Sequence, residues 1–515
     1  MARLYEYQSK ELLAKGGLPV PRGRTAADPQ QAAEIAAELV GPVVVKAQAW
    51  ITGRAQAGGV RFADTPDQAR IEAEALLGLS IKGFKIREVL VEERLDIEQE
   101  LFLGLVMDDA AKAPIIVFSS LGGSGIEEIA REHPDKVVRE TVDVLWGFQG
   151  HQARDLLRRL DIRGKLQADL AKALVAFYNI CRKNEARSAE INPLVITRQG
   201  RILAADCHMA VDDYAVFRHP ELGIEIAREF DRPATDREKV SYQVEAKDHR
   251  GTFYFLEMAR DFAPRSGYVG FHGAGGGGSM MSMDALHQVG FKIANFCDTS
   301  GNPSAAKVYR AARIILSQNN IDGYFASGSG VASQEQFHSA RGLVKAFREV
   351  GLHLPAVVRI GGNFEEEAIE ILERYTADLP AKVEAYGRDT SALYCARRLR
   401  ELVDHWDYEA AKPAGRPAPD PDSYNYHFQT MTGRLCIDHD RCAACNTKPC
   451  IKACTAEILK LDEDRPVLAI DPEQAAKGRC TECLACELAC EFEGNKALYI
   501  HLPIEGLDEA LSSGS

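Results

Sequence analysis

The chain has 515 residues and a formal charge of −13. This length predicts about three or four domains, and the negative charge disfavours general binding to nucleic acid or to an anionic membrane surface. No hydrophobic run reaches the length of a membrane span, and the first residues lead into an amphipathic helix instead of a signal peptide, so we expect a cytoplasmic protein.

The N-terminal region begins with a helix over 4–15 that ends at Gly16-Gly17. A second helix opens at Asp28-Pro29, with Asp as N-cap and Pro at the first helical position. A buried strand over 43–46 is followed by a loop of small residues over 52–59. Lys46, at the end of that strand and beside a glycine-rich loop, is placed to bind phosphate. The alternative is that Lys46 only reaches solvent.

Two further strands are predicted over 89–93 and 100–106, and a hairpin over 188–206 turns at Gln199-Gly200. The hairpin presents oxygen-bearing side chains, among them Asn192 and Asp206. Oxygen ligands suit Mg²⁺, which usually takes one or two of them from the protein. The alternative interpretation is a half-buried hairpin in which Asn and Asp only cap turns.

Several of these segments, in this order, resemble the ATP-grasp half of the succinyl-CoA synthetase β-subunit family. They are Leu4–Lys10, Val44–Lys46, Ala57–Val60, Leu90–Glu92, Glu100–Gly104 and Glu190–Thr197. The resemblance implies an ATP/ADP and Mg²⁺ site. It implies that Lys46 and the loop Gly53, Arg54 and Ala55 contact the phosphates, that Glu92 and Leu95 lie at the adenine hinge, that Glu100 binds the ribose, and that Asn192 and Asp206 hold Mg²⁺. The loop departs from the family pattern at Ala55 and Gln56, where Gly and Lys are usual.

From residue 266 onward, strands alternate with helices. Strands are predicted over 268–271, 295–298, 323–326, 356–359 and 383–386, and helices over 280–289, 305–316, 334–350, 365–375 and 389–403. This alternation predicts a doubly wound parallel sheet, flavodoxin-like, with its site at the carboxyl ends of the strands.

This half also resembles the ligase domain of the same β subunits, through Ala294–Phe296, Ile314–Ser317 and Val357–Asn363. In that family a helix N-terminus of the β subunit faces a phosphohistidine carried by an α subunit, and by position Gly328, Ser329 and Gly330 would supply the helix start. The substrate-contacting Asn of the family falls near Ala274, so succinate is in doubt as the substrate. His272 lies beside glycines, but we do not expect it to carry phosphate. We expect a separate α-type CoA-binding partner and a hetero-oligomer.

A linker rich in Pro and Ala precedes two cysteine runs that contain eight of the thirteen cysteines. The second run has the spacing of bacterial two-cluster ferredoxins, in which the fourth Cys of each run binds the other cluster. The prediction is therefore one [4Fe–4S] cluster on Cys442, Cys445, Cys450 and Cys490, and another on Cys454, Cys480, Cys483 and Cys486. Zinc knuckles and disulfides are the alternatives.

The expected architecture is an α/β multidomain chain with an ATP-grasp domain over 1–240, a flavodoxin-like domain over 241–408, a linker over 409–430 and a small α+β ferredoxin domain over 431–515. The expected function is the β-type subunit of an ADP-forming acyl-CoA synthetase that acts on a carboxylate and CoA and serves a redox partner. The alternative is an ATP-gated, low-potential electron-transfer subunit that makes no thioester.

Overall fold

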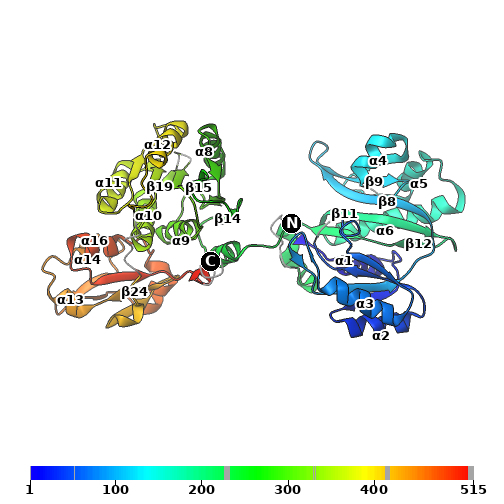
Figure 1. Cartoon of the computed structure of the whole chain (residues 1–515), viewed down its shortest axis with the longest axis horizontal. Helices are drawn as coiled ribbons and strands as arrows, with labels where there is room; N and C mark the ends of the chain where they lie inside the picture. Colours follow the sequence, from blue (N-terminus) through cyan, green and yellow to red (C-terminus); the bar gives the residue numbers. More distant parts are fainter. Residues whose placement is uncertain are drawn as a thin grey trace. The chain divides into compact units, whose positions relative to one another are not determined.

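The structure is a computed structural model that describes residues 2–50, 53–123, 125–224, 232–328, 330, 332–411 and 418–508. The chain forms two compact units, Met1–Pro233 and Ala234–Ser515 (Figure 1). Ser329 and residues 412–417 of the predicted linker lie outside the described residues. Among the described residues, no helix combines the length and the apolar character that crossing a bilayer requires.

The first unit contains a small antiparallel sheet covered by two helices. Its strands follow the order β2 (Gly23–Ala26), β7 (Val89–Glu93), β3 (Val43–Ala47) and β4 (Val60–Ala63), and its helices are α2 (Pro29–Leu39) and α3 (Pro66–Leu77). The predicted cap is present, because Asp28 Oδ1 accepts a hydrogen bond from Gln31 N at 2.9 Å. Ile35, Val45 and Val91 belong to one apolar cluster between helices and sheet, which fixes the end of β3 where Lys46 lies.

A larger sheet completes this unit. Its strands follow the order β1 (Ala2–Arg3), β13 (His208–Val211), β11 (Ala186–Thr197), β8 (Ile97–Asp108), β9 (Ala113–Ser119) and β10 (Val137–Thr141). The helices of this part are α1 (Glu6–Lys15), α4 (Ile126–Glu132), α5 (Gly150–Arg158) and α6 (Gly164–Lys183). Leu101, Leu103 and Leu105 of β8 are buried in a core shared with α5 and α6. The alternate residues of β8 therefore face the other side of the sheet.

The predicted hairpin is confirmed. β11 pairs antiparallel with β12 (Ile202–Ala204), with Leu194 opposite Ala204 and Ile196 opposite Ile202. Gly200 in the turn has φ of 73°, a left-handed conformation that glycine adopts without strain. β11 also pairs with β13. Asp206 therefore lies in the link between β12 and β13, which both pair with β11.

The second unit contains the predicted parallel sheet. Its strands follow the order β14 (Tyr254–Glu257), β17 (Asn295–Asp298), β15 (Tyr268–Ala274), β18 (Gly323–Gly328), β20 (Ala356–Arg359) and β22 (Val383–Tyr386). β14 is antiparallel to β17, and the other five strands are parallel in the chain order 2-1-3-4-5 of flavodoxin-like sheets. The helices are α7 (Asp236–Ala246), α8 (Gly276–Gln288), α9 (Ala305–Leu316), α10 (Phe337–Val350), α11 (Glu365–Thr376) and α12 (Ala392–Asp404).

Two boundaries differ from the sequence-based expectation. Helix α7 spans the expected division between residues 240 and 241 and belongs to the second unit. The expected helix start at 328–332 is wrong, because β18 ends at Gly328, a short strand β19 (Ala332–Glu335) follows, and α10 begins only at Phe337. β19 pairs with β21 (Gly362–Asn363), a tertiary contact that outweighs the local glycine pattern.

The cysteine-rich segment packs into the second unit. Its three-stranded antiparallel sheet has the order β23 (Tyr426–Gln429), β24 (Arg434–Ile437) and β27 (Leu498–His501), and a hairpin joins β25 (Leu459–Asp462) to β26 (Arg465–Leu468). Short helices α13 (His439–Ala443) and α14 (Pro449–Ala453) and the longer α16 (Ala485–Glu493) carry four of the eight clustered cysteines. One apolar core runs from α9 and α10 into this segment, so the two parts fold together.

Candidate functional site

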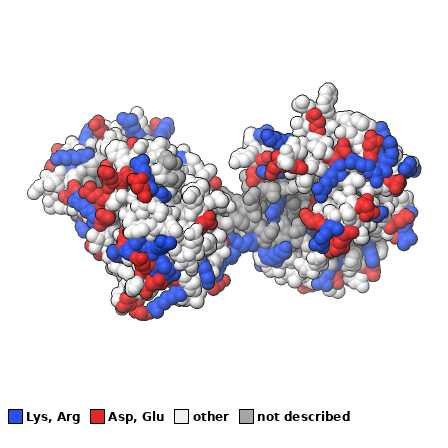
Figure 2. Space-filling model, turned by 90° about the horizontal axis from the view of Figure 1, so that it is seen from above, with Lys and Arg blue, Asp and Glu red and all other residues white. Residues whose placement is uncertain are grey.

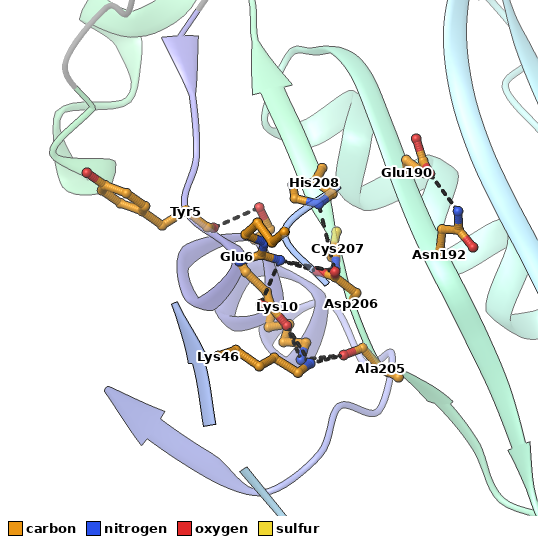
Figure 3. Close-up of polar contacts among 12 residues, drawn as sticks. Tyr5, Glu6, Lys10, Lys46, Glu190, Asn192, Ala205, Asp206, Cys207 and His208 are labelled. Atoms are coloured by element: carbon orange, nitrogen blue, oxygen red, sulfur yellow. Dashed lines mark hydrogen bonds and ion pairs between the residues drawn. The ribbon is translucent and has the colours of Figure 1, made fainter. Parts of the chain in front are cut away.

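Lys46 lies in a cluster of buried charges at the end of β3. Its Nζ is 2.8 Å from Glu6 Oε1 and 3.0 Å from Glu92 Oε2, and it donates a hydrogen bond to the carbonyl oxygen of Ala205 at 2.7 Å. Figure 3 shows Lys46 pointing from its strand toward helix α1 and the Ala205 carbonyl. Lys46 is therefore held by two carboxylates of the chain, instead of reaching solvent.

Helix α1 supplies two further members of the cluster. Lys10 Nζ donates to both carboxylate oxygens of Glu92 at 2.7 Å and lies 2.7 Å from Glu6 Oε1. Glu6 and Lys10 lie in the Leu4–Lys10 segment that resembles the family, but no role was predicted for either residue. The only signal that could have found them is a pair of charges within the predicted apolar face of the first helix.

Arg54, from the glycine-rich loop, joins the cluster to Asp206. Its Nη2 lies 3.0 Å from both oxygens of Asp206 and 2.8 Å from Glu6 Oε2. Arg54 is buried, while its predicted loop partners Gly53 and Ala55 are exposed. The loop thus directs one guanidinium inward onto the carboxylate that was predicted to bind Mg²⁺.

The neighbouring charges hold these groups ionised. Burial raises the pKa of Glu6, but the charges of Lys10, Lys46 and Arg54 outweigh burial. The pKa of Glu6 therefore lies well below its usual range. Burial lowers the pKa of Lys46, but Glu6, Glu92 and Asp206 outweigh burial and raise it. The cluster is therefore a set of ion pairs at neutral pH, and a phosphate group that enters it competes with carboxylates.

Asn192 lies on β11, beside the link that holds Asp206. Its Oδ1 accepts a hydrogen bond from Gly123 N at 2.9 Å, and its Nδ2 donates to Glu190 Oε1 at 3.1 Å. Asp206 already binds a cationic group, the Arg54 guanidinium, and His208 Nε2 lies 3.8 Å away. One oxygen-bearing side chain on β11 and one in the link between β12 and β13 fit the ligand chemistry of Mg²⁺, which needs only one or two protein oxygens.

The three residues predicted to contact the adenosine part are dispersed. The Glu92 carboxylate is 2% exposed and is bound to Lys10 and Lys46. Leu95 is half-buried in the link between β7 and β8, and Glu100 is exposed on β8 opposite Val195.

A cavity of about 660 Å³ lies along the face of the large sheet that carries Glu190 and His208. Its lining also includes Arg3, Trp50, Phe102 and Arg139. This volume is within the range of small-molecule sites, and the lining combines apolar surface with a few charged groups, as such sites do.

In the second unit, the predicted acyl-transfer residues lie at the carboxyl edge of the parallel sheet. Gly328, the last residue of β18, pairs with Ala274 of β15, and Arg359 Nη1 donates to the Gly328 carbonyl oxygen at 2.9 Å. Gly330 has φ of 76°. Arg359 therefore fixes the carbonyl of Gly328 at the end of β18, and the next described helix, α10, begins only at Phe337.

His272 is buried within this sheet. Its Nδ1 lies 2.5 Å from the Tyr324 hydroxyl, and burial lowers its pKa to about 4. The imidazole is neutral at physiological pH and is 4% exposed.

The clustered cysteines gather into two sets of four. In the first set, Cys442 interacts electrostatically with Cys445 and Cys490, and Cys450 interacts with these three. In the second set, Cys480 interacts with Cys454 and Cys483, and Cys486 interacts with all three. All thirteen cysteines are free thiols, and Cys436 is buried on β24 outside both sets.

Each set is made of four thiols drawn from both cysteine runs, which is the donor chemistry of a [4Fe–4S] cluster. Within the described residues, no group of three or more His, Cys, Asp or Glu side chains is arranged to hold a single metal ion.

Comparison with known proteins identifies the class first. Residues 3–196 match the family model described as an ATP-grasp domain, and residues 262–396 match the model described as ATP citrate lyase citrate-binding. The Methanothrix soehngenii ATP citrate lyase, solved in complex with citrate and coenzyme A, aligns with a TM-score of 0.62 at 19% identity, covering 78% of this chain and 99% of that one. At that identity the likeness shows the fold alone.

Curated relatives define the family. The chain is 39% identical over 370 residues to the GDP-forming succinate–CoA ligase subunit β of Thermus thermophilus, covering 72% of this chain and 93% of the relative. It is 36% identical over 401 residues to the ADP-forming subunit β of Rubrobacter xylanophilus, covering 78% of this chain and 98% of the relative. The chain belongs to the succinate–CoA ligase β-subunit family and is an enzyme of the acid–thiol ligase class.

Proposed function

We propose that this chain is the β-type subunit of an ADP-forming acyl-CoA synthetase that also carries an electron-transfer module. The reaction converts ATP, a carboxylate and CoA into an acyl-CoA, ADP and phosphate. The observation that carries the ligase assignment is the match over 93% of a relative, together with the Lys46 and Arg54 cations at the cleft of the first unit.

In this proposal the first unit binds the nucleotide. Lys46 and the loop Gly53–Ala55 bind the phosphates, Glu92 and Leu95 border the base, and Glu100 faces the ribose. Asn192 and Asp206 hold Mg²⁺, which neutralises phosphate charge when bound. Arg54 contacts both oxygens of Asp206, so a metal held by Asp206 would share this carboxylate with the guanidinium, which could also bind a phosphate oxygen.

The phosphate then passes through a partner. An α-type CoA-binding subunit supplies a histidine that accepts the γ-phosphate and gives it to the carboxylate. The CoA thiolate attacks the acyl carbon, and phosphate leaves. The intermediate is useful because a carboxylate is a poor acyl donor until its oxygen becomes a phosphate leaving group. In this proposal Gly328 and Gly330 belong to the segment that would receive the phosphohistidine, together with Ser329, which lies outside the described residues.

The cysteine sets are the support for the electron-transfer module. We propose that Cys442, Cys445, Cys450 and Cys490 hold one [4Fe–4S] cluster, and that Cys454, Cys480, Cys483 and Cys486 hold the other. A bound cluster would supply one-electron transfer. Thioester chemistry moves no electrons, so the module serves a redox partner that acts on the same acyl-CoA.

The alternative function is an ATP-gated electron-transfer subunit that makes no thioester. The packing of the cysteine-rich segment onto α9 and α10 favours some coupling between the two activities.

Release of ADP tests the ligase assignment. The protein is purified anaerobically with its genomic neighbour and assayed with and without CoA, over a panel of carboxylates, with the iron oxidised or reduced. Release that requires both CoA and one carboxylate supports the proposal. Release that ignores CoA but follows the redox state supports the alternative.

A further inference from the structure

The first set of cysteines lies beside a buried cation. Lys448 belongs to the first cysteine run and is 5% exposed. Its Nζ donates to the Cys445 carbonyl oxygen at 2.6 Å and to Asp464 Oδ2 at 2.9 Å. The Asp464 side chain is 72% exposed, so water screens its charge more than it screens the buried ammonium.

Hydrogen-bond donors reinforce this positive environment. Cys490 Sγ accepts from Ala497 N at 3.2 Å. The Lys448 ammonium and the Ala497 N–H group both stabilise added negative charge at the first set.

The second set lies beside buried carboxylates. Glu482, between the ligands Cys480 and Cys483, is 2% exposed. Its carboxylate accepts hydrogen bonds from Thr430 Oγ1 at 2.7 Å and from Thr432 N and Oγ1 at 2.6 Å each. These three donors are neutral.

Two cations approach the second set from the ligase helices. Arg310 of α9 interacts electrostatically with Glu482. Lys345 Nζ of α10 lies 2.5 Å from Glu487 Oε1, and Glu487 follows Cys486 in the chain. Arg310 donates its own hydrogen bonds to the carbonyl oxygens of Pro503 and Thr432, and Lys345 is shared with Glu349. Within the part of the chain that the structure describes, Glu482 has the neutral hydrogen-bond donors of Thr430 and Thr432 and no cation in ion-pair contact.

Reduction adds negative charge to an iron–sulfur cluster, so a nearby cation raises its potential and a nearby carboxylate lowers it. We propose that the first set holds the higher-potential cluster and the second set the lower-potential one, and that Lys448 and Glu482 set the difference. This inference rests on the proposed binding of two clusters.

Solvent exposure acts in the opposite direction. Cys454 and Cys483 of the second set are half-buried, whereas all four thiols of the first set are buried. Contact with water raises a cluster potential. The charges prevail because they are buried beside the sulfurs, where screening is weak, while only two of four thiols reach the surface.

The order gives a direction to electron flow. A one-electron donor protein, such as a reduced flavoprotein, would reach the second set through its half-buried thiols Cys454 and Cys483. The electron would then pass to a cluster held by the first set, so that the donor is oxidised and that cluster reduced by one electron, with no proton transfer.

Potentials of the two clusters, recorded by electron paramagnetic resonance on the full chain under anaerobic conditions, test the inference. Lys448→Met is expected to lower the higher potential by at least 59 mV, a tenfold change in the reduced-to-oxidised ratio of a one-electron couple, and to leave the other unchanged. Glu482→Gln, which keeps the carbonyl acceptor, is expected to raise only the lower potential. Lys448→Arg retains the charge and serves as the matched control.

Equal potentials in the unsubstituted protein, or a Lys448→Met shift that falls on the lower-potential cluster or on both clusters equally, would overturn the inference while leaving cluster binding intact. A protein without iron and acid-labile sulfide would overturn the cluster assignment and the inference with it. Iron content thus separates the two failures.

Discussion

Three cations and three carboxylates meet at the end of β3. Lys10, Lys46 and Arg54 balance Glu6, Glu92 and Asp206, so the site is electrically neutral before any nucleotide binds. A phosphate group that binds Lys46 or Arg54 would have to compete with the carboxylates that these cations already contact.

Removing Lys46 leaves two buried carboxylates short of a partner. Lys46→Met is expected to destabilise the first unit by about 3–5 kcal/mol, the usual cost of breaking a buried ion pair from one side, and to abolish ATP-dependent activity. Denaturant unfolding and ADP release measure both effects. Arg198→Gln, which breaks the exposed pair with Asp96, is the control and is expected to cost under about 1 kcal/mol. Equal costs for the two variants would contradict the account.

Protonation of His272 opposes folding. Its pKa is lowered by burial to about 4 in the folded protein, against about 6.5 when unfolded. The stability that the folded protein has because His272 is neutral is therefore fully present above about pH 6.5. It is lost as pH falls toward 4, and the loss is roughly 2 kcal/mol by pH 5. His272→Gln is expected to flatten this part of the acid dependence of unfolding of the second unit. An unchanged pH dependence would show that His272 is not buried neutral.

A functional residue can be predicted from the sequence where its neighbours in the chain form a recognisable pattern. Lys46 and Arg54 follow from a strand end and a glycine-rich loop. The partnership of Lys46 with Glu6 does not, because a separation of 40 residues is closed only by tertiary packing. The two cysteine sets were predictable from the spacing of the two cysteine runs, because two-cluster ferredoxins space their ligands in this way.

At the scale of elements, helices α10 and α16 connect the parallel sheet to the cysteine-rich segment. Lys345 of α10 lies 2.5 Å from Glu487 of α16 and 4.1 Å from the centre of the Tyr499 ring. Tyr375 and Phe492 stack at 4.0 Å beside this pair. Because α16 carries Cys486 and Cys490, the ligase helices support both cysteine sets directly.

The Lys345–Glu487 pair gives a prediction with an internal control. Lys345→Met leaves Glu487 buried without its cation and is expected to destabilise the second unit by about 3–5 kcal/mol. The double variant Lys345→Met with Glu487→Leu removes both charges and is expected to recover most of that loss. Thermal unfolding of the three proteins measures the difference. A double variant less stable than the single one would contradict the assignment of a buried pair.

Elements with alternating strands and helices were the most predictable. The predicted bounds of β17, α9, β20 and β22 are those observed, because each hydrophobic run ends at a turn signal. The start of α10 was not predictable, since residues 332–335 form a strand only through pairing with β21. The docking of α16 on α10 also depends on contacts between distant segments.

On the scale of the whole molecule, the two units differ in how independent their parts are. The first unit has its own two cores. The second unit also has two cores, and one of them joins the flavodoxin-like part to the cysteine-rich segment, although the curated relatives align with only 72–78% of the chain. Figure 2 shows acidic and basic side chains intermingled over the visible face of both units.

The shared core predicts the effect of truncation. A chain ending at residue 408 exposes the apolar surface of α9 and α10 and is expected to aggregate, whereas fragments 1–233 and 234–515 are expected to remain soluble and to unfold cooperatively. Sedimentation and thermal unfolding measure this. A soluble and stable 1–408 fragment would show that the cysteine-rich segment is an independent appendage.

This acid–thiol ligase is proposed to keep its thioester-forming activity while carrying an iron–sulfur module. Mass spectrometry of the CoA pool after incubation of the anaerobic complex with ATP, Mg²⁺, CoA and the carboxylate panel tests it most directly. The account predicts one new acyl-CoA, formed in a ratio of about one to the ADP released and absent with Lys46→Met. ADP formed without any thioester, in an amount that depends on the redox state of the clusters, would contradict it.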